Sequence, residues 1–446
     1  MRLCSYDMQD TLINTGCEDV DRSRLFIWVF FIVLLATKPF VDLTWNFRLF
    51  VVGGVAINFL VIVGLCVFII TGYFYFFQND NKRIFNKRII WLFLGLNLFA
   101  SCIAILFYNR PITDIVDGLV KLFAAYFIYF IGHRFMGNDR DRLRIIGIIW
   151  ITTMLISVLS VIQYSQGTYN IDISQGVERF SGFYNDPGTP SYNAIISLVF
   201  GTLYVEMLRK QKRMVTLIVR IALILTIFVA ATTLKITVTK SALLMLIVFL
   251  AMWFGLYKRK VYIVFPLIIL GSFYIYIKSE TIQLRVAPEL EFLTAEELSM
   301  DQARHIGEGR IAVWERLLIY YSQDYDLFQK LFGSKRSFGA HNQYIAYLME
   351  VGLMGLTFFL IILLRFYRRL IFLFRKYGQP DTYMAIVLLT QFAIVGLAGH
   401  PFYYTTLLWY LMILLSVVNV DFSESVRHSK EGIEFANVVV PQSHAM

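Results

Sequence analysis

The sequence GAHNQYIAYLMEVGLMGLTFFLIILL occupies residues 339–364, where a polar start gives way to an apolar run. From residue 343 onward the run has the length of about 20 residues that a helix needs to cross the ~30 Å hydrocarbon core of a bilayer. Similar runs recur along the 446-residue chain, which is 58% hydrophobic and 16% charged and has a mean hydropathy of +0.62. Soluble globular proteins do not have such a composition. We therefore predict an all-α polytopic membrane protein.

The apolar runs predict about 12 transmembrane helices in a single integral membrane domain, residues 1–446. Acidic and polar residues fill positions 1–21, so a cleaved signal peptide is not expected. The predicted spans are residues 25–41, 52–77, 89–108, 112–132, 145–164, 191–208, 214–233, 241–257, 261–277, 343–364, 382–399 and 402–420.

Basic residues gather in every second loop between the predicted spans, as in Lys82-Arg83 and Arg209-Lys210. The short loops between these hold isolated basic residues such as Arg110. Because cytoplasmic loops are enriched in Lys and Arg, both termini are predicted to be cytoplasmic. The formal net charge of +10 is thereby explained as a topology signal, and no nucleic-acid partner is expected. The four cysteines and six histidines have no metal-ligand spacing, so no metal site is expected either.

Two external segments are longer than the rest, a smaller loop at residues 165–190 and one large loop at residues 278–341. The large loop ends at His341. On a continuous helix, Gly352 lies within about 20° and Gly355 within about 40° of the face that carries His341. Small residues let a neighbouring helix approach closely, so both glycines are predicted to fix His341 at the external membrane surface. Glu350 points the opposite way and is predicted to pair within the bundle.

The pattern of His341 and Asn342, nine residues, Gly352, two residues and Gly355 resembles a known signature. It is similar to the H-[NSQ]-x9-G-x2-[GTY] motif of the O-antigen ligase and O-antigen polymerase superfamily. As in that family, the motif closes the one large external loop and opens a late transmembrane helix. Gly309-Arg310-x3-Trp314 resembles the family's G-R-x3-W element in the same loop, and the turn at 331–333 resembles its following glycine-containing turn.

The smaller external loop carries a further part of the resemblance, which covers most of residues 165–400. Arg179-x2-Gly182, with Asn185 and Pro187, resembles the family's R-x2-G…N-P element. The stretch TVTKS at residues 237–241 resembles the family's T-x-S-R-G element, but it has Lys240 where an Arg is usual. This substitution keeps the positive charge and loses the two-pronged donor geometry of a guanidinium.

The resemblance implies an enzyme of the bacterial inner membrane that transfers glycan from an undecaprenyl-diphosphate-linked oligosaccharide donor to a glycan acceptor. The external side is then periplasmic, and so is the active site. The implied reaction is polymerisation of repeat units into an O-antigen or exopolysaccharide chain. Ligation of O-antigen to the lipid A core of lipopolysaccharide and protein O-glycosylation are alternatives with the same donor. Membrane lipids, a flippase and a chain-length regulator are the further partners that it implies.

The resemblance also implies roles for individual residues. A histidine can take a proton from an acceptor hydroxyl near neutral pH, because its reference pKa lies close to 6.5. Guanidinium and ammonium groups suit the oxygens of a diphosphate leaving group, which needs no ATP, cofactor or metal. The expected catalytic residues are His341 and Arg310, the diphosphate-binding residues are Arg179, Lys240 and Arg310, and the supporting residues are Asn342, Trp314, Gly352 and Gly355.

Other interpretations stay open on the sequence alone. Arg310 and Trp314 could form a structural cation–π pair, Lys240 could extend toward the membrane surface, and His341 could only cap its helix. His305 could replace His341 as the base, and His400 could line the cavity. A transporter is the non-enzyme alternative, although few ionisable residues are predicted to lie within the spans.

Overall fold

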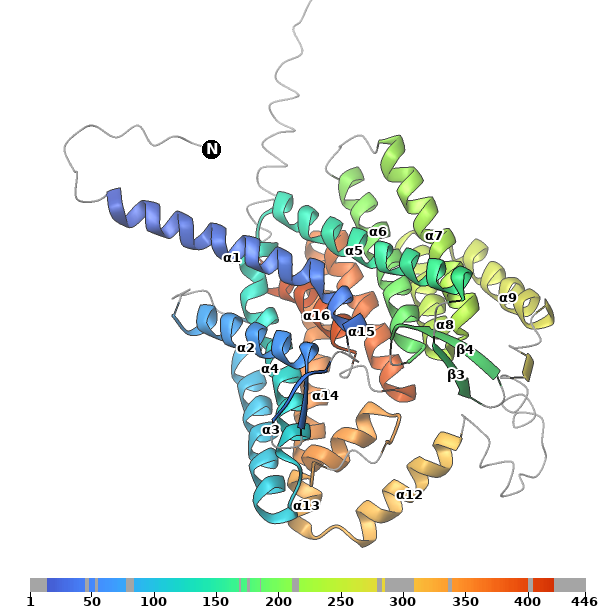
Figure 1. Cartoon of the computed structure of the whole chain (residues 1–446). Helices are drawn as coiled ribbons and strands as arrows, with labels where there is room; N and C mark the ends of the chain where they lie inside the picture. The colour runs from blue at the N-terminus through green and yellow to red at the C-terminus, as the bar shows by residue number, and fades with distance from the viewer. Residues whose placement is uncertain are drawn as a thin grey trace, which may run out of the picture.

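The computed structural model describes residues 14–44, 48–52, 55–77, 84–167, 170–174, 177–184, 186–210, 216–278, 283–284, 309–335, 339–399 and 404–420 (Figure 1). Within these residues the chain is almost entirely helical. The terminal segments whose cytoplasmic location the sequence predicts, 1–13 and 421–446, lie outside the described residues.

The helices follow one another along the chain with short connections. They are α1 (Asn14–Val41), η1 (Asp42–Thr44), α2 (Phe59–Phe77), α3 (Lys87–Tyr108), α4 (Ile112–Met136), α5 (Asp139–Gln166), α6 (Gly188–Lys210), α7 (Leu217–Thr237), α8 (Lys240–Phe249), η2 (Leu250–Tyr257), α9 (Val261–Lys278), α12 (Arg310–Gln323), α13 (Leu327–Phe332), α14 (Gln343–Tyr377), α15 (Pro380–Ala398), α16 (Thr405–Leu415) and η4 (Ser416–Asn419).

Each of the predicted spans coincides with helix in the structure, with one correction at the start of the second. Residues 52–58 belong to an antiparallel hairpin of β1 (Arg48–Val52) and β2 (Val55–Asn58), and the helix begins only at Phe59. A second hairpin, β3 (Asn170–Ser174) with β4 (Val177–Gly182), lies in the smaller external loop. Among the described residues, 8 helices are long and apolar enough to cross a membrane, and three further apolar helices are shorter. The fold is therefore that of an all-α, multi-pass membrane protein.

The centre of the bundle is formed by α6, α15 and α16. The apolar windows of α6 and α15 are 78% and 72% buried, and every residue of α16 is buried. The window of α7 is only 28% buried, and its side chains Ile218 and Phe228 are exposed by 77% and 69%. Large apolar side chains on an outer surface suit contact with lipid, whereas the central helices contact only protein.

Helix α15 shows that the two kinds of loop lie at opposite ends of the bundle. Near its start, the buried carboxylate of Asp381 forms an ion pair with Arg142 of α5 at 2.6 Å. At its end, the carbonyl of Ala398 accepts a hydrogen bond from Arg310 of the large loop. The 19 residues of α15 span about 28 Å at 1.5 Å per residue. The Arg310 end and the Arg142 end are thus separated by the thickness of a bilayer core.

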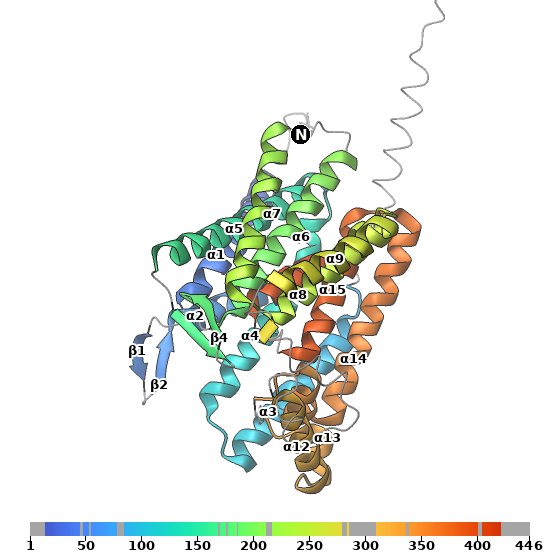
Figure 2. The same ribbon diagram turned by 90° about the vertical axis from the view of Figure 1, so that its right-hand side faces the viewer.

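The large loop packs on α14 at a break in that helix (Figure 2). Gly352 has φ 71° and ψ −174°, a conformation that is not helical and is almost restricted to glycine. Gly333, at the end of α13, has nearly the same conformation, φ 80° and ψ −179°. The backbone N–H groups of Ser334 and Lys335 donate to the carbonyls of Met349 (3.0 Å) and Glu350 (3.1 Å), which have no helical partner at the break.

This arrangement corrects the predicted role of the glycines. A continuous helix was the premise for placing Gly352 and Gly355 on the face that carries His341, and the break at Gly352 removes that relation. A β-carbon at Gly352 would lie 2.3 Å from the backbone of Leu331, so the close neighbour is a turn of the large loop and not another membrane helix. A β-carbon at Gly355 would lie 2.4 Å from the Val351 side chain of the same helix. Both glycines are required by the break itself.

We expect Gly352→Ala to lower the stability of the protein by more than about 3 kcal/mol, because the new methyl group would combine a strained backbone with a clash against Leu331. Thermal unfolding of the purified protein in detergent measures the effect as a large fall in Tm. The matched control is Gly95→Ala in α3, where a β-carbon meets no atom within 4 Å. Equal Tm values for the two variants would contradict the structure of the break.

Candidate functional site at the external end of α15

The end of α15 holds together two of the residues that the sequence singles out. Arg310, the first residue of α12, donates from Nη1 to the carbonyl of Ala398 at 2.6 Å. Asn342 donates from Nδ2 to the carbonyl of Leu397 at 3.1 Å. The last carbonyls of a helix have no partner within the helix and carry its partial negative charge, so they attract donors and cations. The C-terminus of α15 therefore fixes the start of α12 beside the start of α14.

His341 lies in the turn before α14, outside the helix, and has a left-handed backbone conformation with φ 45°. Asn342 is the N-cap of α14, because its Oδ1 accepts from the backbone N–H groups of Tyr344 (3.0 Å) and Ile345 (3.1 Å). On the other side of His341, the carbonyl of Ala340 accepts a hydrogen bond of 2.6 Å from the indole Nε1 of Trp314. His341 is thus held between two tethered neighbours. The predicted support by Asn342 and Trp314 has this physical form.

The charge of Arg310 reaches His341. Partial burial, and then the positive charge of Arg310, lower the pKa of His341 below its ordinary value of 6.5. A histidine with a lowered pKa is neutral at pH 7 and can accept a proton. The side chain itself is exposed. The pair therefore combines a cation with an accessible neutral imidazole.

Three further side chains complete what we call the Arg310 cluster, namely Asp186, Tyr192 and Tyr404. The Tyr404 hydroxyl donates to Oδ1 of Asp186 at 3.2 Å, and the rings of Tyr192 and Tyr404 meet edge to face with centroids 4.6 Å apart. Electrostatic interactions connect Arg310 with both phenol groups. The cluster joins the turn before α6, the start of α6, the start of α16 and the start of α12.

Burial raises the pKa of the Asp186 carboxyl group. Hydrogen bonds from Thr189, Gly188 and Tyr404 oppose this effect in part. Asp186 and His341 are consequently shifted in opposite directions, the carboxyl group toward its neutral protonated form and the imidazole toward its neutral deprotonated form. Pairs of groups with shifted pKa values in one place are typical of catalytic sites, although ion pairs of purely structural function shift pKa values too.

Lys240 is attached to this cluster through its neighbour in the chain. Ser241 Oγ and the Tyr192 hydroxyl share a hydrogen bond of 2.7 Å. A chain of hydroxyl groups fastens the α7–α8 junction to the turn that contains Asp186. In that chain Thr239 donates to the carbonyl of Pro187 at 3.2 Å, and Ser191 donates to Thr239 at 3.0 Å. The start of α8 is therefore fixed beside the cluster.

Arg179 lies on β4, the strand that leads into the turn containing Asp186, and its side chain is half-buried there. The structure thus brings Arg310, His341, Asn342 and Trp314 together, places Lys240 next to them, and puts Arg179 on the adjoining hairpin. Asn185, His305 and His400 lie outside the described residues, as does most of the large loop before Gly309.

Glu350 lies away from His341, as predicted, and interacts electrostatically with Lys335. The Lys335 ammonium donates to Oδ1 of Asn97 in α3 at 3.0 Å. Burial lowers the pKa of Lys335, and the charge of Glu350 opposes that shift. This group of side chains fastens the large loop to the bundle behind the break in α14.

The sequence analysis missed Asp186, Tyr192 and Tyr404. Asp186 lies between Asn185 and Pro187 in the smaller loop, directly before an apolar span, and an acidic residue in such a turn is a usable signal. The two tyrosines are common residues at the ends of membrane helices, and nothing in their spacing distinguishes them.

Comparison with known proteins adds no family assignment. No protein-family model matches the chain, and no curated protein matches it. A function is therefore argued from the motifs and from the geometry of the site.

The proximity of Arg310 predicts a measurable shift at His341. We expect the pKa of His341 to lie below 6.5 and to rise when Arg310 is replaced by Met, because a positive charge near an imidazole disfavours its protonation. NMR titration of ¹³C-labelled histidine in nanodiscs measures this pKa, and His341→Gln identifies its signal.

The control for this titration is Arg316→Met, which removes an exposed positive charge two turns later on α12. It should leave the pKa of His341 unchanged. A His341 pKa above 6.5 in the unmodified protein, or equal shifts in the two variants, would show that Arg310 does not act on the imidazole.

Proposed function

We propose that the protein is a glycosyltransferase of the bacterial inner membrane that acts on polyprenyl-diphosphate-linked glycan. In this proposal it transfers undecaprenyl-diphosphate-linked oligosaccharide repeat units to a growing O-antigen or exopolysaccharide chain on the periplasmic face. The observation that carries the proposal is the pair of Arg310 and His341, held side by side at one end of the bundle by the end of α15. The motif resemblance supports the same conclusion.

The reaction breaks the bond between the anomeric carbon of the donor sugar and the diphosphate oxygen, and forms a bond from that carbon to an acceptor hydroxyl oxygen. The hydroxyl proton moves to the imidazole of His341, which is neutral at pH 7. The electron pair of the broken bond stays on the diphosphate. Arg310 stabilises this developing charge, since a guanidinium has five N–H donors and can hold a carbonyl and a phosphate together. Lys240 and Arg179 lie near enough along the chain to add positive charge.

A base in this position contributes only if it is held and exposed at the same time. The bonds of Trp314 to Ala340 and of Asn342 to Leu397 hold the backbone on both sides of His341, while its side chain remains exposed. Fixed geometry of this kind lowers the entropic cost of bringing base and hydroxyl together. A residue needed only as a helix cap does not require such an arrangement, and Asn342 already caps α14.

The transporter alternative draws on the break in α14, because interrupted helices form substrate sites in transporters. There the carbonyl groups at the break bind the transported ion. Here the carbonyls of Met349 and Glu350 accept hydrogen bonds from Ser334 and Lys335. The break is used for attachment of the large loop, which favours the enzyme.

Ligation of O-antigen to lipid A core and protein O-glycosylation use the same donor and leaving group, so they remain alternatives to polymerisation. The acceptor distinguishes them. Polysaccharide from a deletion strain should carry single repeat units on the core for a polymerase, and free polymer unattached to the core for a ligase.

His341→Gln should lower the rate of glycan transfer by about 10²–10⁴-fold, the range in which general bases contribute. Glutamine keeps hydrogen-bonding ability and lacks a basic nitrogen, so protein level and membrane insertion should persist. The measurement is product formation by purified enzyme from lipid-diphosphate-linked repeat units. Near-normal product would leave His341 with a structural role only.

Arg310→Lys is the companion variant, since it keeps the charge and loses paired donors. We expect it to lose at least about tenfold in rate, the effect of one charged hydrogen bond of roughly 1.5–3 kcal/mol. Arg316→Lys and Lys240→Arg are the controls that should retain activity. Full activity of Arg310→Lys would show that the guanidinium geometry is not used.

The orientation can be tested by labelling single cysteines in intact cells, in a background without the natural cysteines. Cysteine at the exposed position Gln323, in the large loop, should react with an impermeant reagent added to the periplasm, because the basic loops lie at the other end. Cysteine at the exposed position Arg375 should react only after the membrane is permeabilised. Reversed labelling would place the Arg310 cluster in the cytoplasm and contradict the proposal.

A further inference from the structure

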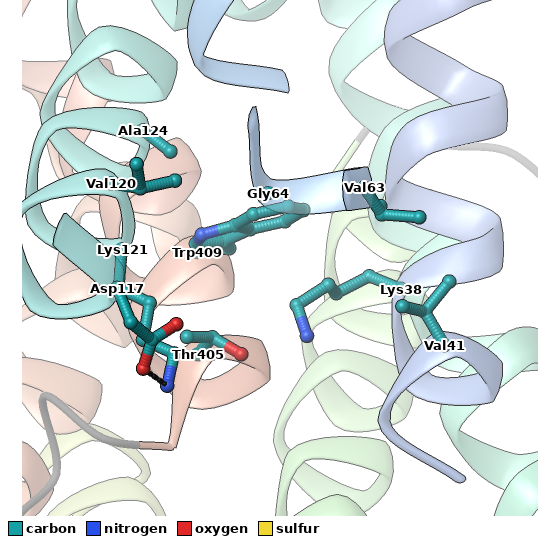
Figure 3. A pocket seen from close by; sticks show the side chains of 10 residues that line it. All are labelled: Lys38, Val41, Val63, Gly64, Asp117, Val120, Lys121, Ala124, Thr405 and Trp409. Atoms are coloured by element: carbon teal, nitrogen blue, oxygen red, sulfur yellow. Dashed lines mark hydrogen bonds and ion pairs between the residues drawn. The ribbon is translucent and has the colours of Figure 1, made fainter. Parts of the chain in front are cut away.

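A cavity lies between α1, α2, α4 and α16, beside the Arg310 cluster (Figure 3). Its empty volume is about 350 Å³, counted with the open space at its mouth, which is within the range of small-molecule sites. The side chains that matter for its chemistry are Lys38, Asp117, Lys121, Thr405 and Trp409. They belong to three different helices, so the cavity is formed by the packing of the bundle.

The charges that line the cavity are balanced in pairs. Lys38, which is only 3% exposed, forms an ion pair with Asp42. Lys121 forms an ion pair with Asp117 at 2.5 Å. With two cations and two carboxylates the cavity has no excess positive charge, which argues against a free anion such as diphosphate as its ligand. It offers both donors and acceptors of hydrogen bonds.

Trp409 supplies the second observation. Its side chain is 2% exposed, and its indole Nε1 has no hydrogen-bond partner within the described part of the chain. Figure 3 shows the ring lying across the cavity, with the indole nitrogen at the end that faces the α4 side chains in this view. Lys38 Nζ lies 5.1 Å from the ring centroid. Leaving a buried N–H donor without an acceptor costs about 1–3 kcal/mol, which a ligand with an acceptor oxygen would remove.

The cavity adjoins the proposed reaction centre through α16. Thr405 lines the cavity, and its neighbour Tyr404 donates to Asp186 in the Arg310 cluster. The two sites are therefore one residue apart along the chain. A molecule that occupied the cavity could extend to the cluster without leaving the protein.

We propose that this cavity binds one sugar ring of the glycan that takes part in the transfer, with Trp409 donating to a sugar oxygen and Asp117 and Lys121 binding hydroxyl groups. Balanced charge, mixed donors and acceptors and an aromatic ring suit a hydroxyl-rich, uncharged ring. The assignment rests on the proposed glycosyltransferase function and adds the position of a sugar-binding subsite, which is separate from the cations that bind diphosphate.

The test uses the full chain in nanodiscs, without its natural cysteines and with Val120→Cys, a partly exposed position that lines the cavity. The reaction of this cysteine with a small thiol reagent is timed in the presence of methyl glycosides of hexoses and N-acetylhexosamines, or of inorganic diphosphate, each in large excess. Slower labelling with a glycoside and unchanged labelling with diphosphate is the expected result. Protection by diphosphate alone, or by neither probe, would overturn the assignment.

Two variants make the result specific. Trp409→Phe in the same background keeps an aromatic ring and removes the N–H donor, so protection by the effective glycoside should require about fivefold more of it, the effect of one hydrogen bond of about 1 kcal/mol. Cysteine at Val116, an exposed residue one turn earlier on α4, should not be protected. Equal protection of both cysteines would mean that the glycoside acts elsewhere.

Failure of the subsite and failure of the proposed function can be told apart, because the labelling needs no activity. Glycan transfer by the purified protein without protection of Val120→Cys overturns the subsite alone. Protection without any transfer leaves a sugar-binding cavity and overturns the transferase.

Discussion

Two glycines in contact attach the large loop to the membrane bundle. Gly333 and Gly352 have almost the same extended, positive-φ conformation, and each faces the backbone of the other's segment so closely that a β-carbon would lie 2.3 Å from it. The contact turns α13 onto α14 and gives the carbonyls of Met349 and Glu350 new donors. The path of the chain from α12 to His341 depends on it. Without this attachment, Trp314 would have no fixed position from which to bind the turn at Ala340.

The sequence predicted much of the helical bundle, because lipid requires long apolar helices and these are visible as uninterrupted runs. The break in α14 could not be predicted in the same way. Gly352 lies within an apolar run, and the periodicity argument assumed a continuous helix through it. The cause of the break is a tertiary contact with Gly333, nineteen positions earlier, which no local pattern contains. The hairpin at residues 48–58 was missed for a related reason, since an apolar strand and an apolar helix have the same composition.

The candidate site was predicted better from its motifs than from its chemistry. Arg310, His341, Asn342 and Trp314 do come together, but the reason is that α15 ends beside them and its last carbonyls accept their hydrogen bonds. The acidic and phenolic part of the cluster, Asp186 with Tyr404, comes from helix starts that are far apart in the chain. Only the packing of α6 against α16 shows that they meet. The adjoining cavity depends on the same packing, because α16 lines it and contributes Trp409.

The central claim is that the Arg310 cluster catalyses transfer of a glycan from a lipid diphosphate. The most direct measurement supplies the purified full chain with undecaprenyl-diphosphate-linked repeat units and follows the lipid and glycan products by mass spectrometry. We expect one undecaprenyl diphosphate to be released for each new glycosidic bond, with the glycan on the remaining lipid lengthened by whole repeat units. If the protein folds and binds the substrate, but the lipid-linked repeat units are recovered unchanged, the account is contradicted.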